Sequence, residues 1–289
     1  MNTLVTGGAG FVGTNLIKRL LKEGHKVTCL DNYSSGLRTN EQEGCTYHDI
    51  DLCDVTDYSD YILDCDVIFH VAALARIQTS LKEPRHHIIN NFESTLNILD
   101  WSREKGGIPI VYAGSSSKHH GVTGSPYAWV KWSGEELCKL YSDVYNVPTS
   151  ICRFYNVYGK HQLEDGAYAT VVGIFEKQYR ENKPLTVTGD GEQRRDFTHI
   201  DDIVDGIVRC GFNLLGDNPI ASGQAYELGR GKNYSINELS EMFGQTEVEY
   251  IPARKGEYQF TLADYTKANQ ELDWTPTLDI KDYISEVIK

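Results

Sequence analysis

The chain has 289 residues, of which 40% are hydrophobic and 24% are charged. This is the usage of an ordinary globular protein, so it excludes a disordered chain or a fibrous repeat and allows one large or two modest domains. Asp and Glu outnumber Lys and Arg by 41 to 28, for a net charge of −13. Such a charge disfavours a nonspecific nucleic-acid binder, so we expect no nucleic-acid partner, and an anionic substrate must be met by a few placed cations.

The sequence contains no pattern that favours a membrane, a metal or a disulfide. No apolar run has the length of a membrane span, and the seven Cys residues form no Cys-x-x-Cys pair. His119 and His120 have no Cys or carboxylate nearby at ligand spacing, so we expect no metal site. The first predicted strand begins almost at residue 1, which leaves no place for a signal peptide. We therefore expect a cytoplasmic protein with reduced thiols and no membrane partner.

A glycine-rich turn joins the first predicted strand, residues 3–6, to a predicted amphipathic helix at residues 14–21. Gly7 allows the chain to reverse sharply, Gly10 lets the backbone approach a pyrophosphate, and Gly13 permits close helix packing. The start of the helix offers free N–H donors to the same anion. The pattern predicts a dinucleotide-binding turn, with a purely structural glycine turn as the alternative.

A second predicted strand, residues 26–30, ends at Asp31. In dinucleotide-binding folds an acidic residue at this point binds the ribose hydroxyls, and its carboxylate would repel a 2′-phosphate. We therefore expect the cofactor to be NAD rather than NADP.

Strands and helices alternate through the rest of the first half. We predict strands at residues 46–50, 66–71, 108–113 and 149–154, and long amphipathic helices at residues 85–103 and 127–145. This alternation predicts an α/β fold with a doubly wound parallel sheet of the Rossmann type and a smaller, interleaved α/β lobe. The expected division is an NAD-binding domain at residues 1–155 and 197–230, and a substrate-binding lobe at residues 156–196 and 231–289.

A tyrosine and a lysine stand four residues apart at the start of the second long helix. Tyr127 and Lys131 would share one helix face, with Ser125 as the N-cap and Pro126 as the first helical residue. A nearby cation favours the phenolate, which would let Tyr127 act as a base below its free pKa of about 10. After a nucleotide-binding fold we favour this reading over an ordinary surface pair.

Three serines follow the predicted strand at residues 108–113. Ser115, Ser116 and Ser117 would lie at the carboxyl edge of a parallel sheet, where ligands of such folds bind. A serine turn that only bonds the backbone is the alternative.

Other segments repeat motifs that occur together in one family. Residues 6–13 and 31–36 have the pattern of its nucleotide turn and its acidic strand end. Residues 70–73 resemble the strand beside the dinucleotide, and Asn91 resembles a central-helix asparagine, although Ser94 stands where glycine is usual. Residues 153–159, 185–197 and 254–257 are similar to its sugar-nucleotide segment, its second-lobe signature and its late arginine and acid.

Nearly end to end, the chain resembles the extended short-chain dehydrogenase/reductase family, specifically the NAD-dependent nucleotide-sugar epimerases and dehydratases, and among these it is similar to UDP-glucose 4-epimerases. The resemblance implies catalytic roles for Ser116, Tyr127 and Lys131. The implied NAD-binding residues are Gly7, Gly10, Phe11, Val12, Gly13, Asp31, Asn32, Ser35, Gly36, Asp51, Leu52, Ala72, Ala73, Ala75, Asn91, Tyr127, Lys131 and Tyr155. The implied substrate-binding residues are Arg76, Ser117, Asn156, Thr170, Val171, Arg195, Arg254 and Glu257.

Two arginines and one acid have specific implied roles. Arg195 and Arg254 would hold the diphosphate of the substrate, which suits bidentate guanidinium groups, and Glu257 would hold the nucleotide ribose. Arg76 follows the strand that lines the sugar pocket, so it could pair with a sugar carboxylate; a solvated or structurally paired arginine is the alternative.

The segment between the serines and Tyr127 is short for this family. Counting back from Gly121 selects Ser116 as the catalytic hydroxyl, with Ser117 as the second choice. The dehydratase and decarboxylase branches carry an acidic residue directly after this hydroxyl, where the chain has Ser117 and Lys118. Elimination across C5 and C6 needs an acid and a base for those two positions, and neither is supplied here, whereas epimerisation at C4 does not need these two groups.

We therefore predict NAD-dependent C4 epimerisation of a UDP-sugar, hexose or hexuronate, through a 4-keto intermediate. A dTDP-sugar substrate stays open. The alternatives are another nucleotide-sugar enzyme of the family, namely a dehydratase, decarboxylase or reductase, and a non-catalytic NAD-binding protein. The family also implies a homodimer formed by the helices at residues 85–103 and 127–145.

Overall fold

The computed structural model describes residues 1–289 apart from 63, 218, 245–246, 255 and 257. Its centre is a seven-stranded sheet in the order β11-β6-β5-β4-β1-β2-β3, and every neighbouring pair is parallel. The strands are β1 (Asn2–Thr6), β2 (Lys26–Asp31), β3 (Cys45–Asp49), β4 (Val67–His70), β5 (Ile110–Ser115), β6 (Thr149–Phe154) and β11 (Gln224–Leu228). The predicted doubly wound sheet is confirmed. The six predicted strands end within two residues of the observed ones, and β11 was not predicted.

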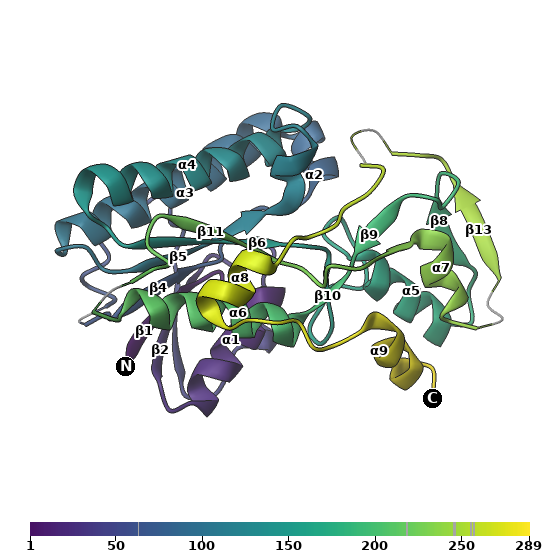
Figure 1. The fold of residues 1–289 in the computed structure, drawn as a ribbon, viewed down its shortest axis with the longest axis horizontal. Helices are drawn as coiled ribbons and strands as arrows, with labels where there is room; N and C mark the ends of the chain where they lie inside the picture. The colour runs from purple at the N-terminus through teal and green to yellow at the C-terminus, as the bar shows by residue number, and fades with distance from the viewer. Residues whose placement is uncertain (63, 218, 245–246, 255, 257) are drawn as a thin grey trace.

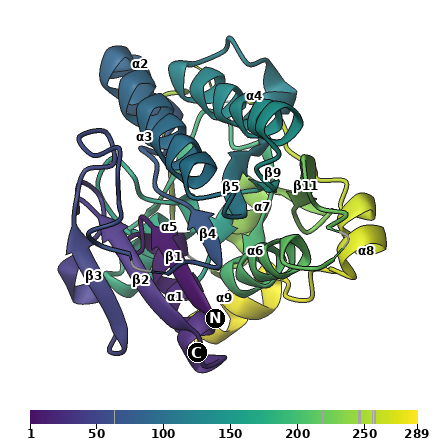
Figure 2. The ribbon, with the colours of Figure 1, turned by 90° about the vertical axis from the view of Figure 1, so that its left-hand side faces the viewer.

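Helices cover both faces of this sheet. Figure 2 shows α3 (Pro84–Glu104) and α4 (Pro126–Tyr145) together on one side, and α1 (Phe11–Lys22) and α6 (Ile200–Leu214) on the other. Successive residues of β1 pack against the helices on opposite faces of the sheet, because side chains alternate along a strand. Leu4 packs with Ile98, Leu99 and Cys138, whereas Val5 packs with Leu16, Ile203 and Ile207. This burial fixes the strands whose carboxyl ends carry the glycine turn and the serines.

The second lobe lies beyond the carboxyl edge of the sheet, on the right in Figure 1. Its core contains Phe175, Val187, Leu239 and Ile284. The lobe is built from α5 (Val171–Arg180), α7 (Ile236–Glu241), α9 (Ile280–Val287) and the two-stranded pairs β8 (Leu185–Thr188) with β13 (Val248–Ile251) and β9 (Arg194–Asp196) with β12 (Asn233–Ser235). A third pair, β7 (Val157–Tyr158) with β10 (Thr198–His199), joins the lobes.

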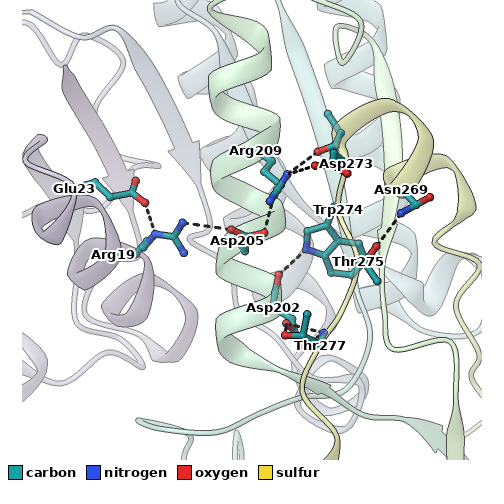
Figure 3. A network of polar contacts seen from close by, with 11 residues as sticks. Arg19, Glu23, Asp202, Asp205, Arg209, Asn269, Asp273, Trp274, Thr275 and Thr277 are labelled. Carbon is teal, nitrogen blue, oxygen red and sulfur yellow. Dashed lines mark hydrogen bonds and ion pairs between the residues drawn. The ribbon is translucent and has the colours of Figure 1, made fainter.

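The segment around α8 (Thr266–Leu272) packs on the Rossmann side. Trp274 is fully buried with the residues of α1 and α6, and its indole N–H donates to the carbonyl of Asp202 at 2.9 Å. Arg209 joins Asp205 to Asp273 in the same network, which Figure 3 shows. We keep the expected two-lobe division as a proposal, and the packing of Trp274 favours counting α8 with the first lobe.

Short elements escaped the sequence analysis. The chain forms α2 (Ile77–Lys82) and the 3₁₀ turns η1 (Arg38–Asn40) and η2 (Ser116–His120). Each spans six residues or fewer, too few to show a helical period. The long helix α6 was missed because the second half was read as irregular. None of the helices in the described part of the chain is long and apolar enough to cross a membrane.

Candidate active site

A cavity of about 830 Å³ runs along the carboxyl edge of the sheet and into the second lobe. Its walls include the residues that follow β1, β2, β4 and β5, and from the other lobe Arg195 and Arg254. The sheet order reverses direction between β4 and β1, and the crevice outside such a reversal is where open α/β sheets bind their ligands.

The glycine turn forms one end of the cavity. Gly7 has φ +70°, and a Cβ there would lie 2.7 Å from Ala72 Cα. A Cβ on Gly13 would lie 2.2 Å from the Gly7 carbonyl oxygen, so the turn and the helix can approach only without side chains. Among the described residues, no side chain caps α1 at Gly10 and no acid lies in its first turn. The first N–H groups of α1 therefore suit a pyrophosphate.

Asp31 lies at the end of β2 and is largely buried. Its carboxylate oxygens accept one backbone N–H each, from Ala9 and Tyr33, both at 2.8 Å. Burial raises its pKa, and these two hydrogen bonds oppose the rise. Each oxygen keeps a lone pair for a further donor, which fits the hydroxyls of a cofactor ribose. Asn32 donates to Asp51 at 2.9 Å and fixes the adjacent wall.

Most of the predicted cofactor residues line the cavity. Three do not, although the resemblance implied them: Asn91, Lys131 and Tyr155. Those that do are Gly7, Gly10, Phe11, Val12, Gly13, Asp31, Asn32, Ser35, Gly36, Asp51, Leu52, Ala72, Ala73, Ala75 and Tyr127.

Asn91 does not line the cavity itself but supports a segment of backbone that does. Its side-chain amide exchanges two hydrogen bonds with the backbone of Leu74, accepting from the N–H at 2.7 Å and donating to the carbonyl at 3.1 Å. This pairing fixes the segment between Ala73 and Ala75. Tyr155 is also buried, and its hydroxyl donates to Glu227 at 2.9 Å.

Tyr127 lies in the first turn of α4 and lines the cavity. The predicted cap is confirmed, because Ser125 accepts the Ala128 N–H at 3.1 Å and Pro126 begins the helix. Burial raises the pKa of the Tyr127 phenol, while a hydrogen bond with Ser115 and the charge of Arg76 oppose the rise. The phenol therefore needs positive charge nearby to act as a base near neutral pH.

Lys131 follows one turn later and is buried. Its ammonium nitrogen lies 4.3 Å from the centre of the Tyr112 ring. Burial lowers the pKa of Lys131 to about 8, although the carboxylate of Glu135 opposes this. Lys131 was expected to lower the pKa of Tyr127, whereas the cation that opposes the rise of this pKa is Arg76.

The serine turn follows β5. All three hydroxyl residues line the cavity, and they differ in their contacts. Ser115 caps the turn by accepting the Ser117 N–H at 3.2 Å, and it bonds Tyr127. Ser116, the sequence choice for the catalytic hydroxyl, is half-buried at the cavity wall, and Ser117 has a buried hydroxyl with no partner among the described residues. The sequence placed Ser115 at the carboxyl edge of the sheet but gave it no catalytic role, because its contact with Tyr127 depends on how β5 and α4 pack.

Three consecutive side chains hold η2 in place. Lys118 lies 3.9 Å from the buried carboxylate of Glu135, and His119 Nε2 lies 2.6 Å from Glu227 Oε1. The ring of His120 stacks on Tyr258, with 4.3 Å between ring centres. Tyr258 lines the cavity and carried no signal in the sequence. The short segment is thus anchored on three sides.

The predicted substrate residues come from both lobes. Glu257 lies outside the described residues. Arg195 is on β9 beside Asp196, whose buried carboxylate accepts N–H groups from Arg230, Gly231 and Ala263 at 2.8–3.0 Å. This hub fixes the strand that carries Arg195. The predicted residues that line the cavity are Arg76, Ser117, Asn156, Thr170, Val171, Arg195 and Arg254.

The described residues contain no group of three or more His, Cys, Asp or Glu side chains arranged to hold a metal ion.

Residues 3–215 match the model of the NAD dependent epimerase/dehydratase family. A putative UDP-glucose 4-epimerase of Methanocaldococcus jannaschii is 31% identical over 99% of this chain and 96% of its own. The chain therefore belongs to the NAD dependent epimerase/dehydratase family, and its cofactor is NAD.

Solved structures of other proteins have a similar fold over nearly the whole length of this chain. UDP-glucose 4-epimerase of Thermotoga maritima, solved with UDP-glucose, is 27% identical with a TM-score of 0.89 and covers 100% of this chain and 97% of its own. UDP-glucuronic acid 4-epimerase of Bacillus cereus, in complex with UDP-glucuronic acid and NAD, is 29% identical with a TM-score of 0.87, over 99% and 97%. The relatives also include a UDP-N-acetyl-α-D-glucosaminuronate decarboxylase of Bacillus cytotoxicus, 27% identical over 99% and 96%.

Proposed function

We propose that the protein interconverts UDP-sugars by inverting the configuration at C4. The observation that carries this proposal is the distribution of acids around the cavity. Among the described residues, the only carboxylates that line it are Asp31 and Asp51, both beside the glycine turn. The Tyr127 end has serine hydroxyls and Arg76 instead. Elimination of water needs an acid and a base at C5 and C6, whereas epimerisation needs one group that exchanges a proton with the C4 hydroxyl.

Tyr127 is that group in the proposed reaction. Its phenolate takes the C4 hydroxyl proton, Ser116 shares the hydrogen bond, and the neighbouring serine Ser115 holds the phenol oxygen. NAD, when bound, would supply the redox chemistry at C4 by taking up a hydride from that carbon and giving it back. Tyr127 then gives the proton back to the C4 oxygen. Lys131 is proposed to hold the nicotinamide ribose, and Arg195 and Arg254 to hold the diphosphate of the substrate.

The test is product analysis with UDP-glucose, UDP-galactose, UDP-glucuronate, UDP-galacturonate and dTDP-glucose. We expect a product of unchanged mass that differs only at C4, seen by mass spectrometry and NMR, with no consumption of added NADH. A product lighter by one water would identify a dehydratase, and one lighter by carbon dioxide a decarboxylase. Stoichiometric NADH oxidation would identify a reductase. NAD binding without turnover of any of these sugars would identify a non-catalytic protein.

The placement of the diphosphate has its own test. Arg195→Ala and Arg254→Ala should each weaken UDP-sugar binding and leave NAD binding unchanged, because both guanidinium groups lie on the second-lobe side of the cavity. Removing a charge-assisted hydrogen bond typically costs about 1.5–3 kcal/mol, roughly ten- to a hundredfold in affinity. Calorimetry with each ligand measures both effects. Unchanged UDP-sugar affinity in both variants would place the diphosphate elsewhere.

A further inference from the structure

Arg76 is held in a backbone conformation that most residues avoid. It directly precedes α2 and has φ +151° and ψ +136°. Such strain in a non-glycine residue persists where the surrounding structure imposes it, and it concentrates at ligand sites. Here it follows the segment that Asn91 braces at Leu74 and brings the Arg76 side chain to the cavity wall.

The Arg76 side chain is half-buried at the cavity wall and has no negative partner among the described residues. Nε and Nη2 both donate to one neutral acceptor, the carbonyl of Tyr168, at 3.1 and 2.7 Å. Within the described residues no Asp or Glu lies within ion-pair distance, and the N–H groups on Nη1 form no hydrogen bond. A guanidinium has five donors and keeps its charge in proteins. Because burial removes part of the water around this charge, a bound anion would stabilise it.

The position of Arg76 relative to Tyr127 identifies which part of a substrate it faces. Ser80, on the helix that Arg76 begins, accepts the Tyr127 backbone N–H at 3.2 Å. The Arg76 charge also lowers the pKa of the Tyr127 phenol. Arg76 is therefore at the reacting end of the cavity, whereas Arg195 and Arg254 come from the other lobe. A group bound by Arg76 should be a neighbour of the sugar C4.

We propose that Arg76 binds the C6 carboxylate of the sugar, so that the preferred substrate is a UDP-hexuronate rather than a neutral UDP-hexose. C6 is attached to C5, the carbon next to C4, so its carboxylate lies within reach of a cation beside Tyr127. Planar guanidinium and carboxylate groups pair through two parallel hydrogen bonds. The proposal rests on the proposed function and names the substrate class of the same site.

Binding to a variant that cannot turn over separates this proposal from the reaction itself. The protein loaded with NAD and carrying Tyr127→Phe is titrated with UDP-glucuronate, UDP-galacturonate, UDP-glucose and UDP-galactose by calorimetry. We expect the hexuronates to bind about a hundredfold more tightly than the hexoses, the size of effect of one desolvated charge pair. Equal affinity for both classes overturns the proposal, whether or not C4 epimerisation is observed. If the hexuronates bind more tightly but the unsubstituted protein does not epimerise them, the substrate proposal stands and the proposed function is overturned.

Substitutions then assign the preference to Arg76. Arg76→Gln should weaken hexuronate binding to the level of the hexose and leave hexose and NAD binding unchanged, whereas Arg76→Lys should keep part of the preference. The exposed Arg103→Gln serves as the matched control and should change neither. If Arg76→Gln weakens the binding of hexuronates and hexoses equally, Arg76 has only a structural role through its hydrogen bonds to Tyr168, and the proposal is wrong. If Arg76→Gln fails to fold, the relative affinity for hexuronates and hexoses of the protein that keeps Arg76 still decides the proposal.

Discussion

Tyr127 shows how opposing environments act on one residue. Burial raises the pKa of its phenol, and Ser115 and Arg76 oppose the rise. A bound oxidised nicotinamide would add a further positive charge, which favours the phenolate. The same burial lowers the pKa of Lys131 to about 8, so both members of the predicted pair leave their ordinary values for one physical reason. They share a helix face as the spacing predicted, but their polar ends have different neighbours.

Replacing the phenol tests the proposed base. Tyr127→Phe should keep the fold and NAD binding while kcat falls by about a hundred- to ten-thousandfold, the usual worth of general acid/base catalysis. Tyr141→Phe on the same helix is the control, because its hydroxyl donates to Asp100 and the residue does not line the cavity. Steady-state kinetics on the preferred UDP-sugar compares them. A rate near that of the unsubstituted protein in Tyr127→Phe would exclude this base.

The pH dependence of kcat should distinguish the roles of Ser115 and Ser116. Ser115→Ala removes the hydrogen bond that lowers the pKa of Tyr127, so the rise of kcat with pH should move to higher pH. Ser116→Ala should lower kcat without that shift, because Ser116 is predicted to bond the C4 hydroxyl rather than the phenol. Measured profiles of the two variants distinguish these roles. Full activity in Ser116→Ala would show that the sequence prediction is wrong.

Among the elements, η2 has the least support from its own sequence. The turn is five residues long, and its place depends on Glu135, Glu227 and Tyr258, which lie on other parts of the chain. Glu227 is partly buried, which raises its pKa, but donors on His119, Asp264 and Tyr155 more than offset this and hold the pKa below its ordinary value. These contacts stabilise the charged form in the folded state.

A pH dependence of stability follows from the lowered pKa of Glu227. A carboxyl with a depressed folded pKa stabilises the fold above its unfolded pKa, and the contribution is lost as pH falls through the folded value. The free energy of unfolding should therefore decrease as pH falls from about 5 to 3, and Glu227→Gln should make this decrease smaller. Urea titrations across this range measure it. The exposed Glu249→Gln is the control, and identical slopes in the two variants would contradict the prediction.

The whole molecule divides its tasks between two lobes. The parallel sheet presents the nucleotide turn, the serine turn and Tyr127 on one edge, and the second lobe brings Arg195 and Arg254 to the same cavity. The Tyr168 carbonyl, just before α5, meets Arg76 from the first lobe. A contact between lobes thus lies directly beside the proposed base.

The expected homodimer also belongs to this scale and remains a prediction. Leu140 and Val144 lie one turn apart on α4, with 47% and 57% of their surface exposed. Exposed apolar side chains on one helix face favour a partner surface. We expect a dimer by light scattering at micromolar concentration and a monomer in the double variant Leu140→Glu/Val144→Glu. Tyr250→Glu, exposed on β13 of the second lobe, should remain dimeric, and a monomeric unsubstituted protein would contradict the expectation.

Local patterns in the sequence determined much of this protein. The glycine spacing, the strand end at Asp31, the cap at Ser125 and the shared face of Tyr127 and Lys131 depend on neighbours within a few residues, so short-range sterics and periodicity predict them. The strand and helix alternation predicted the sheet in the same way. The absence of an acidic residue directly after the serines, where the chain has Ser117 and Lys118, likewise favours an epimerase from the sequence.

Only the tertiary structure decided which of these groups meet. Arg76 contacts Tyr168 across 92 residues of sequence, and His119 meets Glu227 from a distant strand. Asn91, which is predicted to contact NAD, also bonds the backbone of Leu74, 17 residues away. Ser115 likewise bonds Tyr127. Contacts between distant segments depend on how buried layers pack, and no local period in the sequence records that packing.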